Sequence, residues 1–187
     1  AYSKIYKIRI HVFENILSQI IKDEEVDFTV NKYLKRIKQL TKKSIEINNL
    51  ISEITQKHAK KYLQLSNLQD NEIRNNIFTV SNVSISNDVK NLVEFIYDKI
   101  LFYPTYWKGL DEGVFTKMIF KKDFFECQGH STCTYCDFKE DFELLDFEID
   151  HLLPKSEFPL LYINEMNLFP CCKACNHNHF GKGNNWN

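Results

Sequence analysis

The chain has 187 residues, of which 43% are hydrophobic and 14% aromatic, and its formal net charge is −1. This composition excludes a disordered tail, because disordered segments are poor in apolar side chains. The length allows one hydrophobic core, or a core with a small metal-stapled unit. No apolar run approaches the length of a membrane span, and no signal peptide heads the sequence. We therefore expect a cytoplasmic protein without membrane contact.

The charge is unevenly distributed along the chain. Residues 1–110 carry 17 Lys and Arg against 12 Asp and Glu, whereas residues 111–187 carry 7 against 13. A free-standing DNA-binding protein normally presents a basic face. The acidic second part would therefore need a further grip on a polyanion, unless the difference is only ordinary variation in surface charge.

Glycine and proline divide the chain into two parts. Neither occurs before Pro104, whereas all five glycines and all four prolines lie after residue 103. Since these residues interrupt regular structure, the contrast favours a change of architecture near this point. We predict an α+β protein, with a mainly helical, partner-binding region over residues 1–112 and a small zinc-stapled unit over residues 113–187.

Three segments of the first part are expected to be helical. Residues 4–13 alternate in polarity, which allows a strand, but we favour a helix running to Ile21. Residues 31–65 place apolar side chains at steps of three, four or seven, which predicts one long amphipathic helix. Its basic face is either solvated or binds a partner. Asp88 is the predicted N-cap of a helix through Leu101.

The following segments offer fewer signals. Residues 102–113 contain one proline and two glycines and are expected to form a connector. Residues 114–125 are strongly apolar and are expected to cover the zinc unit. Nothing in residues 1–112 matches a catalytic motif.

The most informative motif is a double pair of cysteines. Cys133-Thr-Tyr-Cys136 and Cys172-Lys-Ala-Cys175 each place two thiols at the spacing of a zinc knuckle. Two such pairs complete a closed tetrahedral site, in which Zn²⁺ is structural. Four of the six cysteines have this spacing, which favours a reducing compartment over a disulfide framework.

The remaining two cysteines leave alternative ligands open. Cys171 adjoins Cys172, and Cys127 together with His130 offers a further possibility. We favour Cys172 because it alone completes Cys-x-x-Cys with Cys175. Cys127 and Cys171 are then predicted to be buried thiols.

Between the two cysteine pairs lie a carboxylate, an imidazole and a carboxamide. Residues 145–152 alternate apolar and polar side chains, which predicts a strand that carries Asp150 and His151 at its end. A loop leads to Asn167, and Asn176 directly follows the last cysteine. The expected order is a hairpin and then a helix. These side chains are typical of a metal-assisted hydrolase.

The cysteine pairs, Asp150-His151-Leu-Leu-Pro, Asn167 and Asn176 together resemble the HNH endonuclease family in its four-cysteine zinc form. The resemblance covers roughly residues 127–183 and depends on several independent spacings. It implies the ββα-metal fold and hydrolysis of phosphodiester bonds in DNA, or in RNA, leaving 5′-phosphate and 3′-hydroxyl ends.

The resemblance also implies a role for each site residue. His151 would be the general base, a task that suits an imidazole because its ordinary pKa of about 6.5 lies near neutral pH. Asp150 and Asn176 would hold one Mg²⁺ or Mn²⁺ ion, since these ions favour oxygen ligands. Asn167 would brace the loop and orient the His151 ring without touching the metal.

Each assignment has a simpler alternative. Asn176 is also a plausible helix N-cap after the zinc knuckle, and Asn167 a plausible turn former. Lys155 and His179 are candidates for phosphate contact, although solvated side chains are common at such places. A zinc-stapled module that binds nucleic acid or protein without cleavage is the alternative to the nuclease. The presence of Asp150 and His151 with both asparagines favours the enzyme.

Small HNH proteins with a helical N-terminal part resemble the nuclease subunits of bacterial anti-phage systems such as Septu. In the Septu system an ATPase partner controls the nuclease. By analogy of architecture, we expect DNA as substrate and a protein partner, a regulatory ATPase, for the helical region.

Overall fold

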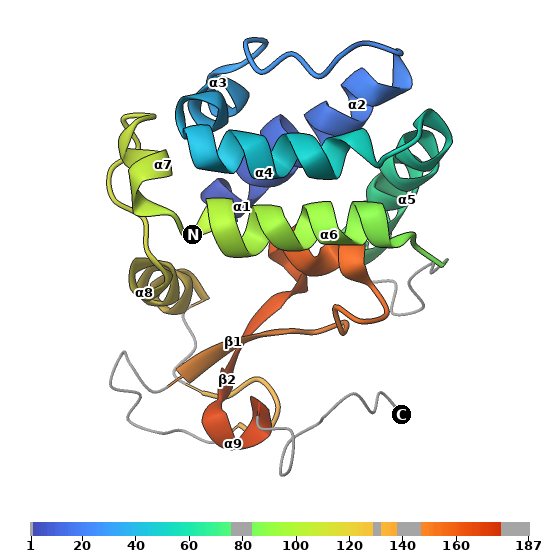
Figure 1. The fold of residues 1–187 in the computed structure, drawn as a ribbon. Coiled ribbons are helices and arrows are strands. Elements are labelled where there is room, and N and C mark those ends of the chain that lie inside the picture. The colour runs from blue at the N-terminus through green and yellow to red at the C-terminus, as the bar shows by residue number, and fades with distance from the viewer. Residues whose placement is uncertain (1, 76–83, 129–131, 138–146, 177–187) are drawn as a thin grey trace.

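The computed structural model describes residues 2–75, 84–128, 132–137 and 147–176, and these residues are mostly helical with a small two-stranded sheet near the C-terminal end (Figure 1). The helical elements of the first part are α1 (Tyr2–Ile8), π-helical η1 (Arg9–Glu14), α2 (Asn15–Ile21), α3 (Lys32–Gln39), α4 (Thr41–Ser52), α5 (Gln56–Arg74), α6 (Asn87–Phe95), π-helical η2 (Ile96–Leu101), α7 (Pro104–Lys108) and α8 (Lys117–Gln128). The later elements are β1 (Phe147–His151), the 3-10 helices η3 (Pro159–Ile163) and η4 (Glu165–Asn167), β2 (Leu168–Cys172) and α9 (Lys173–Asn176). The prediction of a helical region followed by a small mixed unit is confirmed at this level.

The N-terminal segment is helical without interruption as far as Ile21, as predicted. Ile5, Ile8 and Val12 are completely buried, at the spacing of one helix face. The segment that allowed a strand interpretation therefore belongs to a helix that crosses the core.

The prediction of one long helix over residues 31–65 is wrong, because the chain leaves the helical conformation twice within this range. Leu40, with φ −92° and ψ 71°, separates α3 from α4. Thr55 has an extended backbone, and its side chain accepts a hydrogen bond from the His58 amide at the start of α5. Neither break contains Gly or Pro, and both preserve the apolar spacing, so periodicity alone could not locate them.

The helix predicted to end at Leu101 is present as α6 and η2, but its N-cap is Ser86 and not Asp88. Asp88 lies in the first turn, where one carboxylate oxygen is 2.9 Å from His58 Nδ1. The Asp88 carboxylate therefore connects α6 to α5.

A single hydrophobic core crosses the predicted boundary between residues 112 and 113. Phe115, Phe120 and Phe124 are at most 1% exposed and pack in the same cluster as the N-terminal helices. Phe120 also lines a cavity with Glu148 and Ile149 of β1, so this segment packs against the helices and also lies beside the strands, whereas Met118 is 64% exposed. The division into two domains stays a prediction.

The connection between the two strands enters the helical body. Its 3-10 helix η3 carries Leu160, Leu161, Tyr162 and Ile163, which are all at most 6% exposed. This helix packs against α1, α5 and α6, and Figure 1 shows it beneath α6. Burial of these apolar side chains removes the connection from water and fixes its path.

A buried charge cluster ties this connection to the helices. The Arg9 guanidinium lies 3.2 Å from carboxylate oxygens of Glu14 and Asp70. It lies 3.3 Å from Glu165, which in turn is 2.6 Å from Arg74. Because π-helical hydrogen bonds span five residues, η1 brings positions 9 and 14 close together. The cluster therefore joins η1, α5 and η4 in the interior.

Arg9→Ala is expected to lower the free energy of unfolding by about 3–5 kcal/mol, because it leaves buried carboxylates without their cation. Arg74→Ala is the matched control and should cost less, since the Arg74 side chain is 41% exposed. Urea unfolding followed by circular dichroism measures both. Equal losses in the two variants would contradict a central role for Arg9.

Candidate metal and catalytic site

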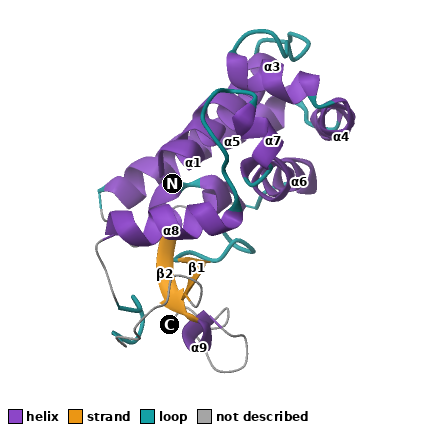
Figure 2. Ribbon diagram, turned by 90° about the vertical axis from the view of Figure 1, so that its left-hand side faces the viewer, coloured by secondary structure: helices purple, strands orange, loops and turns teal. Residues whose placement is uncertain are grey.

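The two strands form an antiparallel ladder that leads directly into a short helix. Phe147 pairs with Cys172, and His151 pairs with Leu168. In Figure 2 the strands descend from the helical body below α8, and α9 lies at their far end. The predicted order of hairpin and then helix is present. The register places His151 at the end of the sheet near the helical body and Cys172 at the opposite end.

The four predicted zinc ligands lie together. Four cysteine Sγ atoms all lie within 4.8 Å of one another, and they belong to Cys133, Cys136, Cys172 and Cys175. The sulfurs of Cys136 and Cys172 are 3.9 Å apart. A tetrahedral site with Zn–S bonds of about 2.3 Å requires sulfurs about 3.8 Å apart. The cluster therefore has the dimensions of a four-cysteine zinc site.

Backbone amides support the sulfurs of this cluster. Cys133 Sγ accepts hydrogen bonds from the amides of Tyr135 and Cys172, at 3.4 and 3.3 Å. Burial raises the pKa of the Cys133 thiol, but such amide donors outweigh burial and lower this pKa to about 7. Burial and the neighbouring cysteine sulfurs raise the pKa of Cys175 well above its usual value. A cation such as Zn²⁺ would relieve this crowding, so the four residues fit the ion.

The fifth described cysteine side chain is not part of the cluster. Cys171 is completely buried, and its thiol lies 3.6 Å from the Glu148 carbonyl oxygen. The structure thus groups Cys172, and not Cys171, with the other three cysteines, and the choice of Cys172 as a zinc ligand stays a prediction. The alternative ligands cannot be compared in the same way, because His130 and the side chain of Cys127 lie outside the described residues.

The first cysteine pair also reaches the predicted catalytic carboxylate. Thr134 anchors the pair to β2, since its amide and hydroxyl donate to the Pro170 carbonyl oxygen at 3.2 and 2.8 Å. The Tyr135 hydroxyl donates to Asp150 Oδ2 at 2.9 Å. Burial and the Asp150 charge raise the pKa of Tyr135, so this hydroxyl remains a donor. Tyr135 was not predicted, because the middle positions of Cys-x-x-Cys carry no signal.

Asn167 is completely buried and holds the backbone that follows β1. Its Oδ1 accepts from the Leu153 amide at 2.8 Å, while its Nδ2 donates to the carbonyl oxygens of Leu153 and Leu161 at 3.1 and 3.2 Å. Its own carbonyl oxygen accepts from the Leu152 amide at 2.8 Å. The carboxamide thus fixes the turn after His151 and the start of the next segment.

The His151 ring is held by the connection that Asn167 braces. His151 Nε2 lies 3.2 Å from the Tyr162 carbonyl oxygen. A carbonyl oxygen only accepts, so this contact assigns the proton to Nε2 and leaves Nδ1 as the basic nitrogen. The ring also packs on Tyr162 and Tyr97, with centroids 4.7 and 5.7 Å away. The Tyr162 carbonyl therefore orients the ring, and Asn167 supports it from both sides, through Leu161 before Tyr162 and through Leu152 and Leu153 after His151.

Asn176 contacts a carboxylate that the sequence analysis did not select. Its Nδ2 donates a hydrogen bond to Glu148 Oε2. Because side chains alternate along a strand, Glu148 and Asp150 project from the same face of β1. The oxygens of Asp150 and Asn176 match the ligand preference of Mg²⁺ and Mn²⁺. The spacing of Glu148 two residues before Asp150 was a readable signal for this neighbour.

Lys155 is the candidate for phosphate contact that lies within the described residues. Lys155 is exposed, with its Nζ 3.4 Å from the Tyr162 hydroxyl and 5.0 Å from the centroid of that ring. It therefore shares Tyr162 with His151. His179 lies outside the described residues.

Comparison with known proteins gives one partial match. Septu protein PtuB of Bacillus thuringiensis is 43% identical over 47 residues, which are 25% of this chain and 18% of that protein. The match thus spans less than a fifth of the relative. No family model and no solved structure matches the chain. Within the described residues, no helix is long and apolar enough to cross a membrane.

Cys172→Ser is expected to abolish stoichiometric zinc binding, because three thiolates and a hydroxyl cannot close the site. Cys171→Ser is the matched control, one position away, and should retain one zinc per chain because its sulfur is outside the cluster. Elemental analysis of the purified variants measures the zinc content. Zinc loss in Cys171→Ser with retention in Cys172→Ser would contradict this ligand set.

Asn167→Ala is expected to lower the free energy of unfolding by about 3 kcal/mol, because each buried backbone group left unpaired costs about 1–3 kcal/mol. Asn167→Asp should cost at least as much, since it sets a carboxylate oxygen against two carbonyl oxygens. Asn49→Ala, at an exposed position in α4, is the control and should change stability by less than about 0.5 kcal/mol. An Asn167→Ala effect as small as the control would show that the carboxamide does not hold the loop.

Proposed function

We propose that this chain is a metal-dependent endonuclease of the HNH type, which hydrolyses phosphodiester bonds of DNA as a subunit of a Septu-like defence complex. One observation carries the proposal: Asp150 and His151 end a strand whose face also approaches Asn176, and a four-cysteine cluster closes the other end of the sheet. The partial similarity to PtuB supports the link to defence.

In this proposal His151 is the general base. Its Nε2 donates to the Tyr162 carbonyl oxygen, so Nδ1 is the atom that takes a proton from the attacking water. The same carbonyl would stabilise the imidazolium that forms. The buried position of Tyr162 within η3 holds the ring in this orientation.

Two further residues would position the metal ligands. Asp150 and Asn176 would hold Mg²⁺ or Mn²⁺, which when bound supplies positive charge to the phosphate and to the departing oxygen. The Tyr135 hydroxyl donates to Asp150 Oδ2 and so would fix the orientation of this carboxylate toward the ion. Glu148 accepts from the Asn176 amide nitrogen and so directs the amide oxygen to the ion.

The helical region would bind the partner that regulates cleavage. Its core is shared with the connection between β1 and β2, so a protein that binds these helices has a direct physical route to the His151 loop. We infer a regulatory ATPase as this partner, from the resemblance to Septu-like systems and the similarity to PtuB.

His151→Ala is expected to reduce plasmid cleavage in Mg²⁺ or Mn²⁺ by about 100-fold or more, because general-base catalysis contributes about 10²–10⁴-fold. His11→Ala, which removes an imidazole from the helical body, is the control and should cleave like the wild type. Both variants are compared at equal zinc content and equal thermal stability, for the chain alone and with the protein that co-purifies with it.

Two results would contradict the proposed function. Equal cleavage by wild type and His151→Ala would assign the activity to another group or to a contaminant. DNA binding without cleavage under every metal and partner condition would identify a binding module instead. Activity that appears only with the partner would agree with regulation by an ATPase, whereas full activity of the isolated chain would remove that part of the proposal.

A further inference from the structure

A small cavity lies beside the candidate metal ligands, between α8 and β1. Its volume is about 150 Å³, several times the roughly 30 Å³ that a water molecule occupies. The residues that line it are Tyr97, Lys117, Phe120, Lys121, Glu148, Ile149 and Asn176. The cavity thus joins the Glu148–Asn176 contact to two lysines that the sequence analysis did not select.

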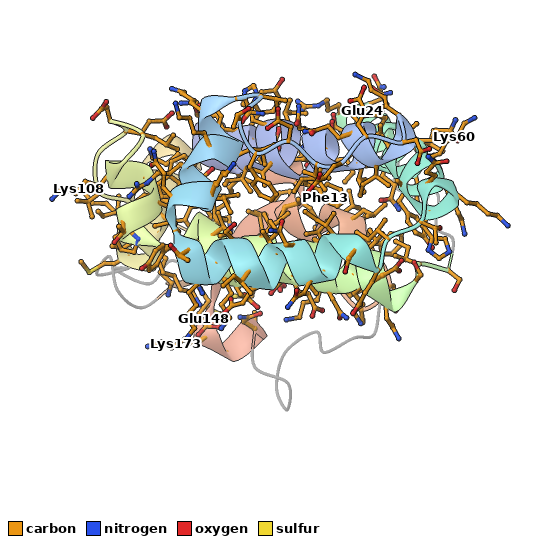
Figure 3. The ribbon with its side chains drawn as sticks, turned by 45° about the horizontal axis from the view of Figure 1, so that its top comes forward. Phe13, Glu24, Lys60, Lys108, Glu148 and Lys173 are labelled. Atoms are coloured by element: carbon orange, nitrogen blue, oxygen red, sulfur yellow. The ribbon has the colours of Figure 1, made fainter. Side chains whose placement is uncertain are left out.

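Among the described residues that line this cavity, two lysines stand beside one glutamate, although residues 111–187 as a whole are acidic. Burial lowers the pKa of Lys121, and the charges of Lys117 and Lys173 lower it further, while Glu148 raises it. The Lys121 ammonium group therefore interacts with two further ammonium groups, of Lys117 and Lys173, and with the Glu148 carboxylate. Figure 3 shows Glu148 and Lys173 on the same side of the molecule, beside α9. An anion placed here would relieve the mutual repulsion of the lysines.

The position of these lysines is set by the packing of α8. Lys117 and Lys121 are one helical turn apart and so lie on one face of this helix. Phe120 and Phe124 follow Lys117 and Lys121 by three residues each, so they lie beside the lysines on the helix, and both are buried with at most 1% exposure. Because the phenylalanines anchor α8, the two lysines are held over the β1 side of the site and do not depend on a loop for their position.

We propose that Lys117 and Lys121 of α8, with Lys173 of α9, bind a backbone phosphate of nucleic acid next to Asn176. This inference rests on the proposed function, because it assigns the grip on the substrate of the same site. A lysine acts on phosphate as a point charge, and phosphate contacts carry no information on base sequence, so this surface binds independently of base sequence. It supplies the basic contact that the overall charge of residues 111–187 does not provide.

The test measures binding separately from cleavage. The zinc-loaded chain of residues 1–187 carrying His151→Ala is titrated onto a fluorescein-labelled DNA duplex, with fluorescence anisotropy recorded at several salt concentrations. The substitutions Lys117→Ala and Lys121→Ala are then introduced together into this His151→Ala chain, and the titration is repeated. Lys57→Ala and Lys60→Ala form the matched control, because they remove the same charge from exposed positions on α5.

The α8 pair is expected to weaken binding by about tenfold or more and to reduce the salt dependence by nearly two phosphate contacts, each contributing about 0.9 to the logarithmic slope. The α5 pair should change the affinity by less than about twofold. If both pairs of substitutions weaken DNA binding equally, the effect is due to net charge and the inference is overturned. Unchanged DNA affinity of the α8 variant would also overturn it.

The outcome is distinguishable from that of the nuclease proposal. If DNA binding depends on the α8 lysines but the chain cleaves DNA under no condition, the proposed nuclease function is rejected and the proposed phosphate surface is retained. Cleavage by the wild type, with unchanged DNA affinity in the α8 variant, would keep the nuclease and place the phosphate contact elsewhere.

Discussion

The connection between the two strands must be buried, and the geometry of the candidate site depends on this constraint. Its 3-10 helix η3 is apolar and packs among α1, α5 and α6, while Glu165 meets the buried guanidinium of Arg9. Asn167 follows immediately and binds the backbone just beyond β1. The helices thereby fix the Tyr162 carbonyl oxygen, which orients His151. The helical region is thus part of the scaffold of the site, whether or not it also binds a partner.

The two ends of the sheet are held by different kinds of interaction. At the end near the helices, burial and backbone hydrogen bonds determine the position of His151. At the far end, the four-cysteine cluster sets the start of α9 and therefore the position of Asn176. The Tyr135 hydroxyl connects these ends because it bonds Asp150, whereas the Glu148–Asn176 contact lies within the far end. A metal in the cysteine cluster would consequently stabilise the candidate catalytic residues without touching them.

Features that depend on local spacing could be predicted from the sequence. The cysteine pairs, the strand before His151 and the helical N-terminus are of this kind. The interruptions near Leu40 and Thr55 could not be predicted, since tertiary packing breaks a helix there without Gly or Pro. The role of Arg9 could not be predicted either, because Asp70 and Glu165 are distant in sequence and are brought close to it only by the fold.

Native-state hydrogen exchange in increasing urea is the most direct test of a shared scaffold. The Leu153 amide, bonded to Asn167, is compared with core amides of α1 and α5. If the strand connection is integral to the helical core, these amides lose protection together, with the free energy of global unfolding. Exchange of the Leu153 amide through a much smaller opening, while the helices stay protected, would show that the site loop is a separate unit and would contradict the helical scaffold.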